Sequence, residues 1–258
     1  MPRFAANLTM LFGEVPFLER FAAARRAGFD AVEFVSPYEH PAADVAAAAR
    51  GAGVEVALFN LPAGNWAKGD RGMACDPARA AEFRDGVDRA LEYARALGCA
   101  RLHAMAGIRP GGVPETELRA AYLSSLRLAA SAVGREGRTL VVEGINSRDM
   151  PGYYLGTSRQ AFALMDEVGA PNLHYLYDVY HMQIMEGDLA PTIEARLPRI
   201  GHVQIADTPG RHEPGTGEIN YRFLLRHLDR LGYRGIVGCE YKPLGRTEDG
   251  LGWMREVA

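Results

Sequence analysis

Short runs of apolar and β-branched residues alternate along the chain with longer segments in which apolar residues recur at helical spacing. The short runs fit buried strands, whereas the longer segments fit helices with one apolar face. The expected strands span residues 3–7, 31–34, 54–59, 101–104, 139–143, 174–178, 200–205 and 236–240. The expected helices span residues 16–27, 42–52, 77–97, 114–136, 158–168, 189–196, 221–231 and 251–257.

Eight strand–helix units therefore follow one another, and such alternation predicts a parallel sheet. Eight units within 258 residues have the size of a closed (β/α)8 barrel. An open doubly wound sheet is the alternative, but no glycine-rich nucleotide fingerprint follows the first strand. Because no linker or low-complexity block divides the chain, we predict an α/β fold in which residues 1–258 form a single TIM-barrel domain.

Composition and charge exclude several classes of protein. Hydrophobic residues make up 48% of the chain, which is enough for a sizeable core. A formal net charge of −3 gives no sign of the basic surface that nucleic-acid-binding proteins show, so we expect no nucleic-acid partner. Three cysteines without a CxxC pair argue against a disulfide framework and favour a reducing cytoplasm. No signal peptide and no membrane-spanning stretch is expected, and the oligomeric state, a homo-oligomer included, stays open.

Acidic side chains end three of the last four expected strands. Glu143 ends the fifth strand, Asp178 the sixth and Glu240 the eighth. Gln204 lies near the end of the seventh strand. Strand ends of a barrel meet at the mouth where catalytic residues gather, so we expect these side chains to converge. Converging carboxylates repel one another unless a divalent cation binds, and oxygen ligands favour Mg²⁺ or Mn²⁺.

Each of these residues also has a structural interpretation. A single acid at a strand end often pairs with an arginine or caps a helix, so only the set as a whole favours a metal site. The seventh strand offers both Gln204 and Asp207, and a neutral amide is the poorer ligand. Strand alternation places Gln204 on the same face as His202 and places Asp207 on the other face. The pattern alone therefore favours Gln204 only slightly.

Three further polar residues follow these strands. His181 lies three residues after Asp178 in an expected loop, where it could donate a hydrogen bond to a substrate. Arg211 follows the seventh strand, and an arginine near a metal suits an anionic carboxylate or phosphate. Lys242 follows Glu240 closely and is one of two lysines in the chain. The alternative interpretations are a solvated histidine at a helix start for His181, an exposed loop arginine for Arg211 and a solvated lysine for Lys242.

Six segments, in order and over nearly the whole chain, match one known family. They are FAANLTMLFGEVPFLERF, NLPAGNWAKGDRGMAC, EFRDGVDRALEYARALG, DVYHMQIMEGDL, GHVQIADTPGRHEPGTGEINY and GCEYKPLGRTEDGLGWM. On these segments the chain resembles the hydroxypyruvate isomerase family of the sugar isomerase/epimerase barrel superfamily. A sister group that acts on 2-oxo-tetronates is similar at MPRFAANLTM and FAAARRAGFDAVEF, so both substrates stay open.

The resemblance implies an isomerase that interconverts hydroxypyruvate and tartronate semialdehyde by proton transfer through a metal-stabilised cis-enediolate. It implies that Glu143, Asp178, Gln204 and Glu240 ligate the divalent metal ion, with Glu143 and Glu240 as the catalytic acids that move protons. One departure is Gly144, because the family usually has proline after the fifth-strand glutamate; a glycine there is expected to loosen the backbone.

The same resemblance bears on the substrate. His181 matches a substrate-contacting position of the superfamily, and Arg211 and Lys242 are further candidates for holding the carboxylate of a small hydroxy-keto acid. The alternative function is a 2-oxo-tetronate isomerase or another ketose isomerase or epimerase of the superfamily. A metal-dependent endonuclease and a sugar-acid-binding protein without catalysis are the rivals from other classes.

Overall fold

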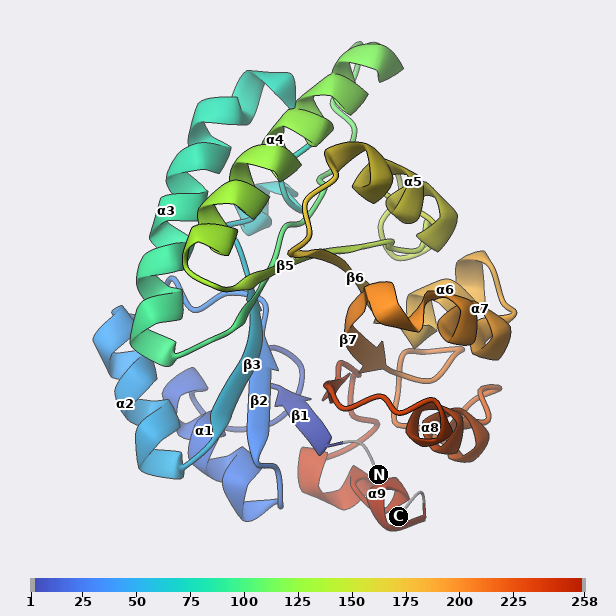
Figure 1. Cartoon of the computed structure of the whole chain (residues 1–258). Helices are drawn as coiled ribbons and strands as arrows, with labels where there is room; N and C mark the ends of the chain where they lie inside the picture. Colours follow the sequence, from blue (N-terminus) through green and yellow to red (C-terminus); the bar gives the residue numbers. More distant parts are fainter. Residues whose placement is uncertain (1–2, 257–258) are drawn as a thin grey trace.

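Eight parallel strands close into a barrel in this computed structural model, which describes residues 3–256 (Figure 1). The strands are β1 (Arg3–Asn7), β2 (Ala31–Phe34), β3 (Glu55–Asn60), β4 (Arg101–His103), β5 (Thr139–Glu143), β6 (Leu173–Asp178), β7 (Ile200–Ile205) and β8 (Ile236–Cys239). Each strand pairs with the next in sequence, and β1 pairs with β8 to close the ring. The predicted (β/α)8 barrel is therefore confirmed, and the open doubly wound sheet is wrong.

Helices surround the barrel and cover the outward faces of its strands. They are α1 (Phe17–Arg26), α2 (Ala42–Ala52), α3 (Ala80–Leu97), α4 (Glu115–Arg135), α5 (Ser158–Val168), α6 (Val179–Met185), α7 (Leu189–Arg196), α8 (Tyr221–Arg230) and α9 (Trp253–Glu256). The long helices α3 and α4 run side by side along the outside (Figure 1). Within residues 3–256, no helix combines the length and the apolar character needed to cross a bilayer.

Several element boundaries shift by one to three residues from the sequence prediction, and three larger or site-related differences follow. An additional helix, α6, begins immediately after β6, because the side chain of Asp178 accepts hydrogen bonds from the first backbone N–H groups of that helix. β8 ends at Cys239, although the N–H of Glu240 still donates to the carbonyl of Ile205 at 3.1 Å. The last predicted helix, over residues 251–257, begins two residues later as α9, and a 3-10 turn, Thr247–Gly250, precedes it; the predicted end at Val257 lies outside the described residues.

Small side chains fill the lower part of the barrel interior. Ala5, Ala31 and Ala57 pack with Ile236 in one buried cluster. Side chains alternate between the two faces of a strand. The next inward positions toward the carboxyl ends are therefore Asn7 on β1 and Glu33 on β2, and both are polar. These polar side chains therefore lie directly above the apolar cluster.

Candidate active site

The carboxyl ends of β5 to β8 bring together the four residues that the sequence singled out. Strand pairing places Asp178 beside Gln204, and ligand atoms of Glu143 and Asp178 lie within 4.8 Å of each other. Glu240 follows β8 directly, and the side chains of all four residues are buried. The predicted convergence at the barrel mouth is present in the structure.

Asp178 combines two functions that the sequence presented as alternatives. Its Oδ1 accepts hydrogen bonds from the N–H groups of Tyr180 at 2.8 Å and His181 at 3.3 Å, which caps α6. Its Oδ2 is buried and has no hydrogen-bond partner. One oxygen therefore fixes the carboxylate, and the other is left to face the site.

Oxygen atoms of three converging residues are buried without partners. They are Oε1 of Glu143, Oδ2 of Asp178 and Oε1 of Gln204. Buried polar atoms without partners are unfavourable unless a ligand satisfies them. Among the described residues, Glu143, Asp178 and His181 also form a group whose ligand atoms all lie within 4.8 Å of one another. These donors fit a divalent cation, and oxygen predominates among them.

The raised pKa values of the acidic side chains also favour a cation site. Burial is the largest cause that raises the pKa of Glu143 well above its usual range, followed by the neighbouring Glu240 and Asp178. Burial likewise raises the pKa of Glu240 to about 8 and that of Asp178 to about 6, against the opposing charge of Arg211. The protein therefore holds three carboxyl groups closer together than three free anions would tolerate.

Arg211 reaches into this acidic cluster from the loop after β7. Its Nη2 lies 2.8 Å from Oε2 of Glu240 and 3.6 Å from Oδ2 of Asp178, and the guanidinium stacks over the ring of Tyr180. Its backbone adopts a φ of 61°, uncommon for a non-glycine residue. Lys242 meets the same segment through its backbone, because its N–H donates to the Arg211 carbonyl at 2.7 Å, whereas its side chain is exposed.

His181 lies in the first turn of α6 and not in a loop, so the predicted loop position is wrong. The cause is the cap that Asp178 provides, which starts the helix directly at the end of β6. The Nε2 of His181 lies 3.6 Å from both Oε1 of Glu143 and Oδ2 of Asp178. Burial and the charge of Arg211 lower the pKa of His181 well below its usual value, which favours the neutral imidazole.

Comparison with known proteins agrees with this geometry. The family described as "Xylose isomerase-like TIM barrel" matches residues 21–257. The chain belongs to the xylose isomerase-like TIM barrel family. It is 50% identical to a protein named 2-oxo-tetronate isomerase from Cupriavidus necator, over 99% of this chain and 98% of the relative. It is 48% identical to a protein named hydroxypyruvate isomerase from Escherichia coli, over 98% of each chain.

A solved structure from Brucella melitensis has nearly the same backbone as this chain. The two superpose with a TM-score of 0.97 at 48% sequence identity, over 99% of each chain. That structure is titled AP endonuclease, family 2. The names of these relatives therefore include two isomerases and an endonuclease.

Glu33 is the main residue of this barrel site that the sequence interpretation missed. Glu33 belongs to no recognisable sequence motif. It is nevertheless fully buried, and its carboxylate accepts hydrogen bonds from three other side chains. These come from Nδ2 of Asn7 at 3.0 Å, Nε2 of Gln204 at 2.7 Å and Nε2 of His202 at 2.6 Å. The one available signal was its position at the end of the second strand, combined with His202 on the same strand face as Gln204.

The structure also separates Gln204 from Asp207. Oδ1 of Asp207 accepts from the N–H groups of Thr208 and Ile219, and Oδ2 accepts from the N–H of Gly215. Asp207 therefore organises the loop after β7. Gln204, at the end of β7, faces the barrel interior and keeps a free oxygen.

Gly144 is held more firmly than the sequence suggested. Its N–H donates to the hydroxyl of Tyr175 at 3.2 Å, a contact that proline cannot make. A Cβ at this position would lie 2.9 Å from the same hydroxyl. The glycine therefore allows Tyr175 to pack closely behind Glu143, and this contact holds the backbone at the position where loosening is expected.

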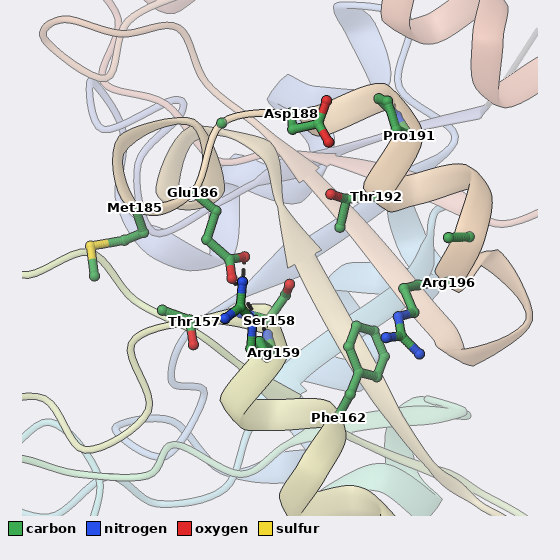
Figure 2. Close-up of a pocket in the computed structure, with 12 residues that line it drawn as sticks. Thr157, Ser158, Arg159, Phe162, Met185, Glu186, Asp188, Pro191, Thr192 and Arg196 are labelled. Carbon is green, nitrogen blue, oxygen red and sulfur yellow. Dashed lines mark hydrogen bonds between the residues drawn. The ribbon is translucent and has the colours of Figure 1, made fainter.

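Two cavities lie beside the acidic cluster and do not include it. One, of about 830 Å³, is lined in part by Phe17, Tyr38 and residues 61–67 of the long connection after β3. The other, of about 700 Å³, lies between α5 and α7 (Figure 2). There the carboxylate of Glu186 accepts from the N–H groups of Ser158 and Arg159, so the N-terminus of α5 is already satisfied by the protein itself. Neither cavity offers a competing arrangement of acids.

Proposed function

We propose that this protein is an isomerase that interconverts hydroxypyruvate and tartronate semialdehyde (2-hydroxy-3-oxopropanoate). The observation that supports this most is the pair of buried glutamates at the ends of β5 and β8, Glu143 and Glu240, with β6 and β7 between them. The relative from Escherichia coli that is named hydroxypyruvate isomerase matches along almost the full length of both chains.

The residues of the cluster also suit a metal ion. Glu143, Asp178, Gln204 and Glu240 would hold a divalent cation, Mg²⁺ or Mn²⁺, because their donors are oxygens. When bound, such a cation supplies Lewis-acid polarisation of neighbouring carbonyl and hydroxyl oxygens.

The reaction moves one hydrogen between adjacent carbons, and each of the two glutamates carries out one proton transfer. One carboxylate removes the proton from C3 of hydroxypyruvate, and the electron pair of that C–H bond forms the C2–C3 double bond of an enediolate. In the same step the C2 carbonyl electrons move onto the C2 oxygen. The other, protonated, glutamate then delivers a proton to C2, and the proton of the C3 hydroxyl passes to the C2 oxygen, so that C3 becomes the aldehyde and C2 bears a hydroxyl. In the metal-free fold, burial raises the pKa of both glutamates, which favours the protonated form that a proton donor needs.

Arg211 is the residue we assign to the substrate carboxylate. Its guanidinium is positioned among the acids, and arginine pairs with carboxylates through two parallel hydrogen bonds. His181 faces the same space and contacts the substrate, and Lys242, exposed on the neighbouring loop, adds positive charge at the rim. A small anionic substrate would therefore meet the guanidinium of Arg211 directly beside the proton-transferring acids.

A 2-oxo-tetronate, one carbon longer, is the second candidate substrate. The protein from Cupriavidus necator that carries that name is 50% identical to this chain. The enediolate chemistry of Glu143 and Glu240 is the same for both substrates, so the two candidates differ only in the chain that follows the reacting carbons.

Proton NMR in D₂O tests the proposal directly. Metal-loaded protein is mixed with hydroxypyruvate or with a 2-oxo-tetronate, with an EDTA-treated sample as control and an abasic-site DNA duplex in a parallel nicking assay. We expect hydroxypyruvate to convert to tartronate semialdehyde faster than the tetronate reacts. Faster reaction of the tetronate would move the protein to the second candidate, and DNA nicking without turnover or isotope exchange would overturn the isomerase.

A further inference from the structure

The amide of Asn146, in the loop after β5, has a fixed orientation. Its Oδ1 accepts hydrogen bonds from the backbone N–H groups of Arg148 at 3.0 Å and Asp149 at 2.8 Å, which forms a local side-chain turn. The residue is fully buried, so solvent offers no alternative partner. Rotating the amide by half a turn would point its N–H₂ group at two backbone donors. The oxygen therefore accepts from the turn, and Nδ2 is the donor end, with one contact to Oδ2 of Asp149 at 3.3 Å.

The nitrogen of this amide reaches His181. Nδ2 of Asn146 lies 2.6 Å from Nδ1 of His181, and the backbone N–H of Asn146 lies 3.4 Å from the same ring nitrogen. Both groups of Asn146 are donors, and the backbone group cannot act in any other way. Nδ1 must therefore carry a lone pair and no proton. A neutral imidazole then carries its one proton on Nε2.

That proton points into the acidic cluster. Nε2 lies 3.6 Å from Oε1 of Glu143 and from Oδ2 of Asp178, too far for good hydrogen bonds. A ring nitrogen that bears a proton has no lone pair with which to bind a cation. His181 can thus donate to an oxygen placed between it and the acids, although its position resembles that of a metal ligand.

We propose that Asn146 is a positioning residue that locks His181 as the Nε2–H tautomer, so that His181 donates a hydrogen bond to a substrate oxygen and does not ligate the metal. The tautomer assignment depends only on the contacts of this chain. The donation to substrate rests on the proposed function, because the oxygen that gains negative charge in an enediolate is the acceptor that benefits most.

Nitrogen NMR of the metal-free protein, labelled with ¹⁵N in its histidines, tests the tautomer without any substrate. Wild-type protein should show an unprotonated Nδ1 and a protonated Nε2 for His181, assigned by the loss of these signals in His181→Gln. Asn146→Asp keeps an acceptor for the turn but turns an oxygen toward Nδ1, so the proton should move to Nδ1. Asn65→Asp, in an exposed loop, is the matched control and should leave both signals unchanged. A protonated Nδ1 in the wild type would overturn the proposal.

Titration with Mn²⁺ alone tests the second half of the proposal. His181→Gln should change the Mn²⁺ dissociation constant by less than about threefold, whereas Asp178→Asn should raise it by about tenfold or more. Equal losses in the two variants would make His181 a ligand and reject the assignment. With hydroxypyruvate, Asn146→Asp should lower kcat about 10- to 100-fold with a smaller change in KM. If the tautomer is as stated and hydroxypyruvate is not turned over, the proposed function fails and the role of Asn146 in setting the tautomer stands.

Discussion

The Nε2 of Gln204 donates a hydrogen bond of 2.7 Å to Oε1 of Glu33, across the interior of the barrel. Since a carboxylate accepts and does not donate, this contact decides which end of the amide faces Glu33. The oxygen of Gln204 is consequently left without a partner and faces the other way. In the sequence, Gln204 is a doubtful ligand because a neutral amide binds a cation less well than a carboxylate. The contact with Glu33 compensates for this, because it fixes the amide with its oxygen toward the site.

Glu33→Gln should weaken divalent metal binding by about 10- to 100-fold, the usual loss when the partner that orients a ligand is removed. Without the carboxylate, the amide of Gln204 can present either its oxygen or its N–H₂ group to the site. Calorimetric titration with Mn²⁺ measures the change. Glu19→Gln on α1, outside the site, is the matched control. An affinity within twofold of the wild type would show that Glu33 does not orient the ligand.

Gly238→Ala should disturb the same contact from the opposite strand. A Cβ at Gly238 on β8 would lie 2.3 Å from the carboxylate oxygens of Glu33, so the glutamate must move. We expect a loss of about 1–3 kcal/mol in the free energy of unfolding, as for other overpacked interiors, together with weaker Mn²⁺ binding. Thermal denaturation and titration measure the two effects. Gly245→Ala, whose Cβ would meet nothing within 4 Å, should change neither.

Glu143→Gln should abolish isomerisation and yet stabilise the metal-free protein. The amide cannot take up or deliver the proton, so turnover should fall by at least about 10²- to 10⁴-fold. Burial and two neighbouring acids raise the pKa of Glu143, so a neutral isostere removes an unfavourable charge from the fold. The melting temperature of the EDTA-treated variant should exceed that of EDTA-treated wild type. Normal turnover, or a lower melting temperature, would contradict this assignment.

Sequence periodicity was sufficient to predict the barrel and the position of Glu143, Asp178 and Gln204, because each unit places one strand end at the mouth and alternation fixes the face. It could not reveal the function of Glu33. The partners of Glu33 on β7 are 169 and 171 positions away in sequence, and no local pattern encodes such a pair. It also missed α6, because seven residues that follow directly on a strand give too short a helical repeat to recognise.

Metal removal should make stability depend on pH in a defined direction. In the metal-free fold, burial raises the pKa of Glu240 to about 8 from its ordinary value of 4.5, and raises that of Asp178 to about 6. Between the unfolded and folded pKa values, the folded state binds more protons than the unfolded chain. Stability is therefore fully retained below the unfolded values and is lost as the pH rises toward about 8.

Bound metal should remove this dependence, because a ligated carboxylate is already ionised. The difference in melting temperature between metal-loaded and EDTA-treated protein should therefore widen steadily from about pH 5.5 to about pH 8, and metal binding should release protons in that range. Thermal denaturation at several pH values measures the first effect, and calorimetry in buffers of different ionisation enthalpy measures the second. Glu240→Gln should flatten the metal-free profile at its upper end. A difference in melting temperature that stays constant with pH would show that these carboxyl groups do not share a metal ion.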